Sequence, residues 1–142
     1  MFWKRSAIPT AKLGAKGERR ARWFYRLRGY RVLEANVKLR GGELDLVVQR
    51  GRTLVFVEVK TRQSLRAGHG YHAVDLRKQF RLVRLVDEYL ATRVVGRVRI
   101  RYDVMSLFWN GRWFEITRFE DAFRPEVDLR QPWRWRGPPV VN

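Results

Sequence analysis

Two segments of the chain repeat their apolar residues at the spacing of an α-helix. The first, residues 10–28, places an apolar residue on one face at about every turn, and Gly29 follows where a glycine commonly ends a helix. The second, residues 74–92, carries a broader apolar stripe that includes Val83 and Val86, with basic residues beside it. We therefore predict two amphipathic helices, each with one face that packs against other parts of the fold.

Five further segments are apolar or alternate between apolar and polar residues, as β-strands do. They span residues 30–37, 43–50, 53–60, 98–109 and 112–117. In the second of them, the side chains at positions 44, 46 and 48 are expected to share one face. The third is apolar at every position from 54 to 57, which predicts a central strand covered on both faces. The pairs Gly51-Arg52 and Asn110-Gly111 each predict a two-residue turn, and the first suits type II′.

The order of these elements is helix, three strands, helix, two strands. This order predicts a mixed α/β sandwich, with a central sheet and one helix on each side. The predicted domain covers residues 10–123, after a basic leader at 1–9. Residues 124–142 form a tail rich in Pro, Trp and Arg, whose tryptophans either stack on exposed bases or fold back onto the domain. No apolar run has the length of a membrane span or a signal peptide, so we expect a cytoplasmic protein.

The charge of the chain points to a polyanionic partner. Lysine and arginine number 31 against 14 acidic residues, which gives a net charge of +17. Nucleic acid is the first candidate, because arginine binds phosphate through two parallel hydrogen bonds. An anionic membrane surface is the second, and an arginine-biased codon usage would make the charge incidental. The chain has no cysteine, which excludes disulfides, thiolate metal sites and cysteine nucleophiles, and His69 and His72 are the only histidines.

Three acidic residues interrupt apolar strand segments, where a carboxylate is costly unless it is paired or binds a cation. If the turn at residues 51–52 is right, Asp45 lies opposite Glu58, and Glu43 lies opposite Lys60. Opposed strand residues have Cβ atoms roughly 5 Å apart, a separation at which two carboxylates can share one Mg²⁺. The alternative is that Glu43 and Glu58 point to solvent and neutralise Lys60 and nearby arginines. In this polycationic chain we favour the metal site.

The segments Glu-Leu-Asp-Leu-Val at 43–47 and Phe-Val-Glu-Val-Lys-Thr-Arg at 56–62 resemble two linked motifs of the YraN-like family. Gly17-Glu18, Gly29-Tyr30, Lys78 and Arg101-Tyr102-Asp103-Val104 fit the same family. The resemblance covers about residues 14–108 and leaves out the leader and the tail. It implies a restriction-endonuclease-like fold in the order α-β-β-β-α-β-β, similar to PD-(D/E)xK nucleases and especially to archaeal Holliday-junction resolvases.

The resemblance also implies roles for individual residues. Asp45 and Glu58 would ligate Mg²⁺ or Mn²⁺, with the backbone carbonyl of Val59 as a third ligand. Lys60 would position or activate the attacking water, or offset the charge that develops on the phosphate. Glu18 would reach the metal from the first helix through a water molecule. The implied catalytic residues are therefore Glu18, Asp45, Glu58 and Lys60.

Polar residues just after the third strand and in the first turns of the second helix are candidates for contacts with nucleic acid. They are Arg62, Arg66, Arg77, Lys78, Gln79 and Arg81. For Lys78 and Gln79 a solvated helix face is the alternative. Asp103 alternates with apolar residues on a later strand, where it would serve as a buried partner for an arginine.

Together these observations predict a divalent-metal-dependent endonuclease that hydrolyses phosphodiester bonds in DNA. Branched DNA, DNA repair or recombination intermediates, and a homodimer are implied by the resemblance to junction resolvases alone. The alternative is a non-catalytic nucleic-acid-binding module that kept the nuclease fold. That module would bind tightly and in a salt-dependent manner, without metal-dependent turnover.

Overall fold

The computed structural model describes residues 7–63, 76–93 and 96–124. Its elements are α1 (Thr10–Arg26), β1 (Arg31–Leu39), β2 (Gly42–Arg50), β3 (Thr53–Arg62), α2 (Leu76–Thr92), β4 (Arg99–Trp109) and β5 (Phe114–Phe119). This order is the predicted one and corresponds to a restriction-endonuclease-like arrangement. Most of the expected leader and tail, and the loop that follows β3, lie outside the described residues.

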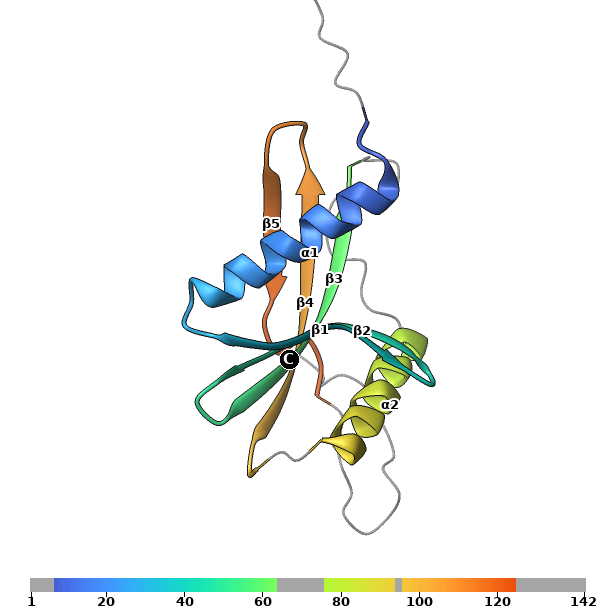
Figure 1. Cartoon of the computed structure of the whole chain (residues 1–142), viewed down its shortest axis with the longest axis vertical. Helices are drawn as coiled ribbons and strands as arrows, with labels where there is room; N and C mark the ends of the chain where they lie inside the picture. The colour runs from blue at the N-terminus through green and yellow to red at the C-terminus, as the bar shows by residue number, and fades with distance from the viewer. Residues whose placement is uncertain (1–6, 64–75, 94–95, 125–142) are drawn as a thin grey trace, which may run out of the picture.

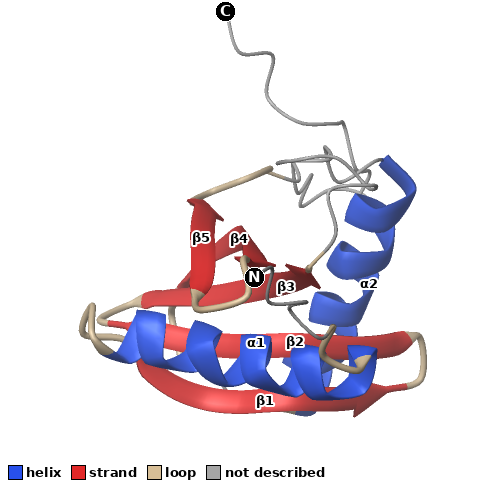
Figure 2. Ribbon diagram, turned by 90° about the horizontal axis from the view of Figure 1, so that it is seen from above, coloured by secondary structure: helices blue, strands red, loops and turns tan. Residues whose placement is uncertain are grey.

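The strands form one mixed sheet in the order β1-β2-β3-β4-β5. Neighbouring strands are antiparallel except β3 and β4, which run parallel. Helix α1 lies across one face of this sheet, and α2 packs on the other (Figures 1 and 2). Strand β3 has buried side chains on both faces: Leu54 and Phe56 belong to the α2 cluster, while Val55 and Val57 belong to the α1 cluster. The prediction of a central strand covered twice is confirmed.

Helix α1 approaches the end of β3 very closely at one glycine. Its buried stripe includes Leu13, Gly17, Ala21 and Tyr25, each four residues after the last, which is the spacing of one helical face. A Cβ atom on Gly17 would lie 2.2 Å from the Oγ1 atom of Thr61, so no other residue fits there without a shift. The helix ends as predicted, with Gly29 at a φ of 84° shortly after its last turn.

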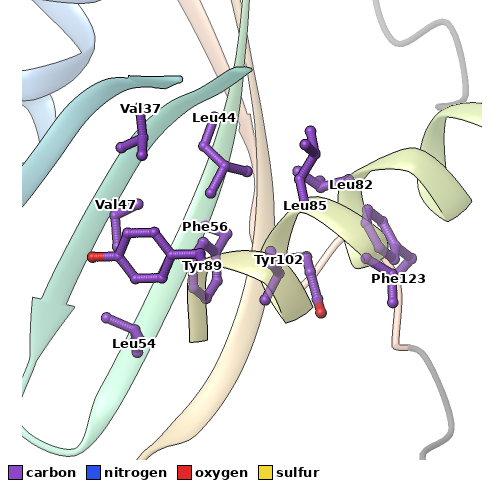
Figure 3. Packing of buried hydrophobic residues seen from close by; sticks show 12 residues of the cluster. Val37, Leu44, Val47, Leu54, Phe56, Leu82, Leu85, Tyr89, Tyr102 and Phe123 are labelled. Atoms are coloured by element: carbon purple, nitrogen blue, oxygen red, sulfur yellow. The ribbon is translucent and has the colours of Figure 1, made fainter. Parts of the chain in front are cut away.

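Strands β1 and β2 form an arm whose outer end bends toward α2. We expected Leu44 to share a face with Leu46 and Val48, and this is wrong. Leu46 and Val48 pack on the α1 side, whereas Leu44 packs beside Leu82 and Leu85 of α2 (Figure 3). The alternation of side chains is therefore broken between positions 44 and 46.

The backbone of β1 shows where the arm bends. Ala35 pairs with Leu46 and Val37 pairs with Leu44, which places Asn36 opposite Asp45. Asn36 has a φ of 52°, in the left-handed region that asparagine tolerates better than most residues. The change of face in both strands thus coincides with a left-handed residue in β1.

The two hairpin turns differ in how well they were predicted. Gly51 has a φ of 58°, and the β2–β3 pairs run from Arg50 with Thr53 to Leu46 with Val57, in the predicted register. The second turn is longer than predicted, because Trp109 pairs with Phe114 and four residues connect the strands. The Asn110 side-chain oxygen accepts hydrogen bonds from the backbone N–H groups of residues 112 and 113, at 2.8 and 3.0 Å. These hydrogen bonds stabilise the wider loop, and β5 therefore begins at Phe114 and not at residue 112.

A fully buried carboxylate, Asp103, joins α1 to β4 and to the turn after β5. It accepts hydrogen bonds from the Tyr25 hydroxyl at 2.7 Å, from the Arg101 Nε at 2.9 Å and from the Asp121 backbone N–H at 3.0 Å. A second Arg101 nitrogen bonds its other oxygen at 2.9 Å, so the ion pair is bidentate. The prediction that Asp103 is a buried partner for an arginine is confirmed.

The approach of α1 to β3 predicts opposite effects for two glycine substitutions in the same helix. Gly17→Ala should destabilise the protein by about 1–3 kcal/mol, because the new methyl group overpacks against Thr61. Gly14→Ala is the matched control: a Cβ there meets no atom within 4 Å, so it should stabilise by about 0.5–1 kcal/mol. Urea denaturation measures both changes. Equal stability of the two variants would contradict the close approach.

Candidate active site

The candidate site begins where β2 and β3 stop pairing. Continued pairing in the same register would place Asp45 opposite Glu58, but the ladder ends one step earlier, at Leu46 and Val57. Instead, the Asp45 side chain accepts a hydrogen bond from the Val59 backbone N–H at 2.8 Å. The carboxylate thus accepts the hydrogen bond that a backbone carbonyl of β2 would accept if the strands stayed paired. Because the N–H and C=O of a strand residue face the same neighbouring strand, the Val59 carbonyl faces β2 as well.

A small cavity lies between this point and α2. It has a volume of about 120 Å³. Its lining consists of Glu43, Asp45, Val57 and Glu58 from the sheet and Lys78, Arg81, Leu82 and Leu85 from α2. A cavity of this size has room for water and for a partly hydrated cation. The cavity brings three of the predicted acidic residues together with two cationic side chains.

The charge of Asp45 is poorly compensated. Burial raises its pKa to about 6, although the hydrogen bond from Val59 acts in the opposite direction. The negative charges of Glu58, Glu18 and Glu43 raise this pKa further. An oxygen-binding cation would relieve the repulsion among these carboxylates.

The donors at the site are of the kind that Mg²⁺ and Mn²⁺ prefer. They comprise the carboxylates of Asp45 and Glu58 and the carbonyl of Val59, all hard oxygen ligands. Within residues 7–63, 76–93 and 96–124, no three Asp, Glu or His side chains converge on one metal position. Two carboxylates, a backbone carbonyl and water, the set that the resemblance to the YraN-like family implies, would fit such a cation.

Lys60 carries an ammonium group that is buried without a hydrogen-bond partner in the described part of the chain. Burial lowers the pKa of Lys60; Glu58 opposes this shift, and the cations Lys78 and Arg62 add to it. A lysine with a lowered pKa exchanges its proton more readily near neutral pH. The structure thus places an ammonium group with a lowered pKa near the charge of Glu58.

Glu18 approaches the site from α1 but does not line the cavity. Its carboxylate accepts a hydrogen bond from the side-chain nitrogen of Asn36 at 3.1 Å, and its charge acts on Asp45. Asn36 is a site residue that sequence reasoning missed. The available signal was a polar residue inside β1 at the position opposite Asp45.

The predicted nucleic-acid contacts divide into three groups. Arg62 lies close enough to act on the pKa of Lys60, and Lys78 and Arg81 line the cavity. Arg77 is exposed on α2. Gln79 is only 5% exposed and lies on the buried face of that helix, so Gln79 is not the surface contact we expected. Arg66, His69 and His72 lie outside the described residues.

The raised pKa of Asp45 predicts how the stability of the metal-free protein depends on pH. A carboxyl group whose pKa rises from 3.8 to about 6 on folding destabilises the folded chain once it ionises. This penalty is absent below about pH 4 and grows as the pH rises from about 4 to about 6. Above about pH 6 it stays at about 2–3 kcal/mol. Asp45→Asn removes the charge but keeps an oxygen for the Val59 N–H. It should therefore stabilise the protein at pH 8 and not at pH 4.

Urea denaturation in EDTA at both pH values measures this difference. Glu115→Gln, at an exposed position on β5, is the control and should leave stability unchanged at either pH. If Asp45→Asn destabilises the protein at pH 8, the carboxylate is compensated and the electrostatic account is wrong.

Sequence comparisons place this site within a known family. The family model "Uncharacterised protein family UPF0102" matches residues 17–107, a range that includes Glu18, Asp45, Glu58 and Lys60. A UPF0102 protein of Symbiobacterium thermophilum is 44% identical over 98 residues, which cover 69% of this chain and 83% of the relative. One of Syntrophotalea carbinolica is 38% identical over 111 residues, which cover 78% and 90%. The chain therefore belongs to the uncharacterised protein family UPF0102, the YraN-like family whose motifs its sequence resembles.

Proposed function

We propose that the protein is a divalent-metal-dependent endonuclease that hydrolyses phosphodiester bonds in DNA. One observation carries the proposal: Asp45 and Glu58 line a cavity where β2 and β3 separate, and the charge of Glu58 acts on the buried ammonium group of Lys60. Stability alone does not favour half-buried carboxylates that repel one another next to an ammonium group with no hydrogen-bond partner in the described part of the chain.

Four groups would hold the metal. The carboxylates of Asp45 and Glu58 and the carbonyl of Val59 would be its ligands, and Glu18 would bind one of its waters. When bound, Mg²⁺ or Mn²⁺ supplies Lewis-acid chemistry, activating water and stabilising negative charge on the phosphate. The hydrogen bond from Asn36 holds the carboxylate of Glu18 on the side of α1 that faces β1.

Lys60 acts on the proton of the attacking water or on the charge of the phosphate. In its neutral form the amine accepts a proton from water; in its charged form it offsets the negative charge that builds up on the phosphate. Both roles need a lysine with no competing acceptor, and the Nζ atom meets this condition within the described residues.

The charge around the site suits a polyanionic substrate. Lys78 and Arg81 stand at the cavity, and the whole chain carries a net charge of +17. Neither helix of the described part of the chain is long and apolar enough to cross a membrane. We propose that the enzyme acts in the cytoplasm, as a homodimer, on branched DNA or on repair and recombination intermediates.

A cleavage assay tests this function directly. Labelled duplex, single-stranded, flap and four-way-junction DNA should be cut in Mg²⁺ or Mn²⁺ and remain intact in EDTA. Asp45→Asn, Glu58→Gln and Lys60→Met should each lower the cleavage rate by about 10²-fold or more, because each removes a group that stabilises the transition state. Binding of the same DNA should change by less than about threefold.

Glu115→Gln removes an exposed carboxylate far from the site in sequence and should cut like the wild type. Cleavage that persists in Asp45→Asn would come from a contaminating enzyme and would overturn the assignment. Tight binding without cleavage by the wild type, in any metal, would instead support the non-catalytic nucleic-acid-binding module.

A further inference from the structure

A second, larger hollow lies on the outer side of α2, next to the active-site cavity. It has a volume of about 750 Å³ and lies between α2 and the turn that joins β1 to β2. We call it the cationic groove, and its polar and aromatic lining consists of Arg40, Arg77, Phe80, Arg81, Arg84 and Glu88. Arg81 and Leu85 line both hollows, so the groove leads directly to the candidate active site.

The walls of the cationic groove are held in place by specific contacts. The carboxylate of Glu88 accepts hydrogen bonds from the backbone N–H groups of Arg40 at 2.7 Å and Gly41 at 3.4 Å, which fixes the turn onto α2. Gly42 has a φ of 143°, and a Cβ atom there would lie 2.9 Å from a terminal nitrogen of Arg81. The missing side chain at Gly42 thus makes room for the Arg81 guanidinium beside the arm.

The arginines of the groove are available to an anionic ligand. Arg77, Arg81 and Arg84 follow one another at intervals of four and three residues, so they project from one face of α2. No ion pair within residues 7–63, 76–93 and 96–124 involves them. The nearby carboxylate of Glu88 is already bound to backbone N–H groups. Arginines arranged in this way bind the phosphates of a nucleic-acid backbone.

Phe80 adds a feature that phosphate binding alone does not explain. Its side chain is 41% exposed and lies between Arg77 and Arg84 along the helix. An exposed aromatic ring among cations offers a platform on which a nucleic-acid base can stack. In a duplex both faces of each base are covered by neighbouring base pairs, so this platform serves only unpaired bases.

We infer that the cationic groove binds a single-stranded segment of nucleic acid, with phosphates on Arg81 and Arg84 and an unpaired base stacked on Phe80. The strand then continues past Arg81 to the active-site cavity. This inference builds on the proposed nuclease function by naming its substrate: DNA with unpaired nucleotides next to the bond to be cut. Binding itself requires neither metal nor cleavage.

Fluorescence anisotropy of the full-length wild-type chain in EDTA tests the groove separately from catalysis. The probes are a labelled 12-nucleotide oligothymidine and a labelled duplex of the same length. Phe80→Ala should weaken binding of the single strand about tenfold or more and change duplex binding by less than about twofold. Phe80→Trp should keep the single-strand affinity, because a larger ring still stacks. Unchanged single-strand affinity in Phe80→Ala would overturn the inference.

Two matched controls separate the groove from general surface effects. Trp113→Ala removes another exposed aromatic, in the β4–β5 loop, and should leave single-strand binding within about twofold. Arg84→Ala should weaken binding of both probes and reduce the steepness of log K against log salt by about one. Arg19→Ala, on the exposed face of α1, is its control and should change neither the affinity nor the salt dependence. Equal losses in Trp113→Ala and Phe80→Ala would contradict a dedicated site.

The two hypotheses fail in distinguishable ways. Loss of single-strand binding in Phe80→Ala together with an absence of cleavage by the wild type supports the groove and overturns the nuclease. Metal-dependent cleavage with no effect of Phe80→Ala on single-strand affinity overturns the groove and leaves the nuclease standing. Thermal denaturation of each variant identifies any that fail to fold, and Phe80→Leu then tests the loss of the ring while keeping an apolar side chain.

Discussion

The buried carboxylate of Asp103 is the interaction on which the arrangement of the α1 side depends. Its hydrogen bonds come from Tyr25 of α1, Arg101 of β4 and the Asp121 backbone after β5, so three separate parts of the chain meet on one side chain. A buried charge that loses its partner costs several kcal/mol, which gives this packing a single favoured geometry. With the end of α1 fixed there, its other end lies against β3 and carries Glu18 toward the site.

A second carboxylate, the half-buried Asp45, has the opposite environment. Asp103 is paired with the guanidinium of Arg101, whereas Asp45 has one backbone donor, from Val59, and several negative neighbours, including Glu58. Packing alone would favour replacing Asp45 with a neutral residue, because its ionised form is destabilised in the folded chain. This environment supports the proposal that the site binds a cation.

The periodic parts of the fold could be predicted from the sequence, because amphipathic helices and buried strands repeat at fixed intervals and Gly51 sets the register of β2 with β3. The irregular parts could not. Strand alternation does not reveal that the side chain of Asp45 accepts a hydrogen bond in place of a backbone carbonyl. Nor does it reveal that Leu44 changes face next to the position of the left-handed Asn36. Each depends on contacts between residues distant in sequence, which no local pattern records.

These irregularities also connect the proposed site to the cationic groove. Because the arm bends near Asn36, Leu44 packs against α2, and the carboxylate of Glu88 can hold the β1–β2 turn. The groove exists only between that turn and the helix, and Arg81 passes from it to the active-site cavity. A straight arm would carry the turn away from α2 and leave the groove without one of its walls. The departure from regular strand geometry is thus what places the cationic groove, the surface proposed to bind a nucleic-acid strand, beside the carboxylates.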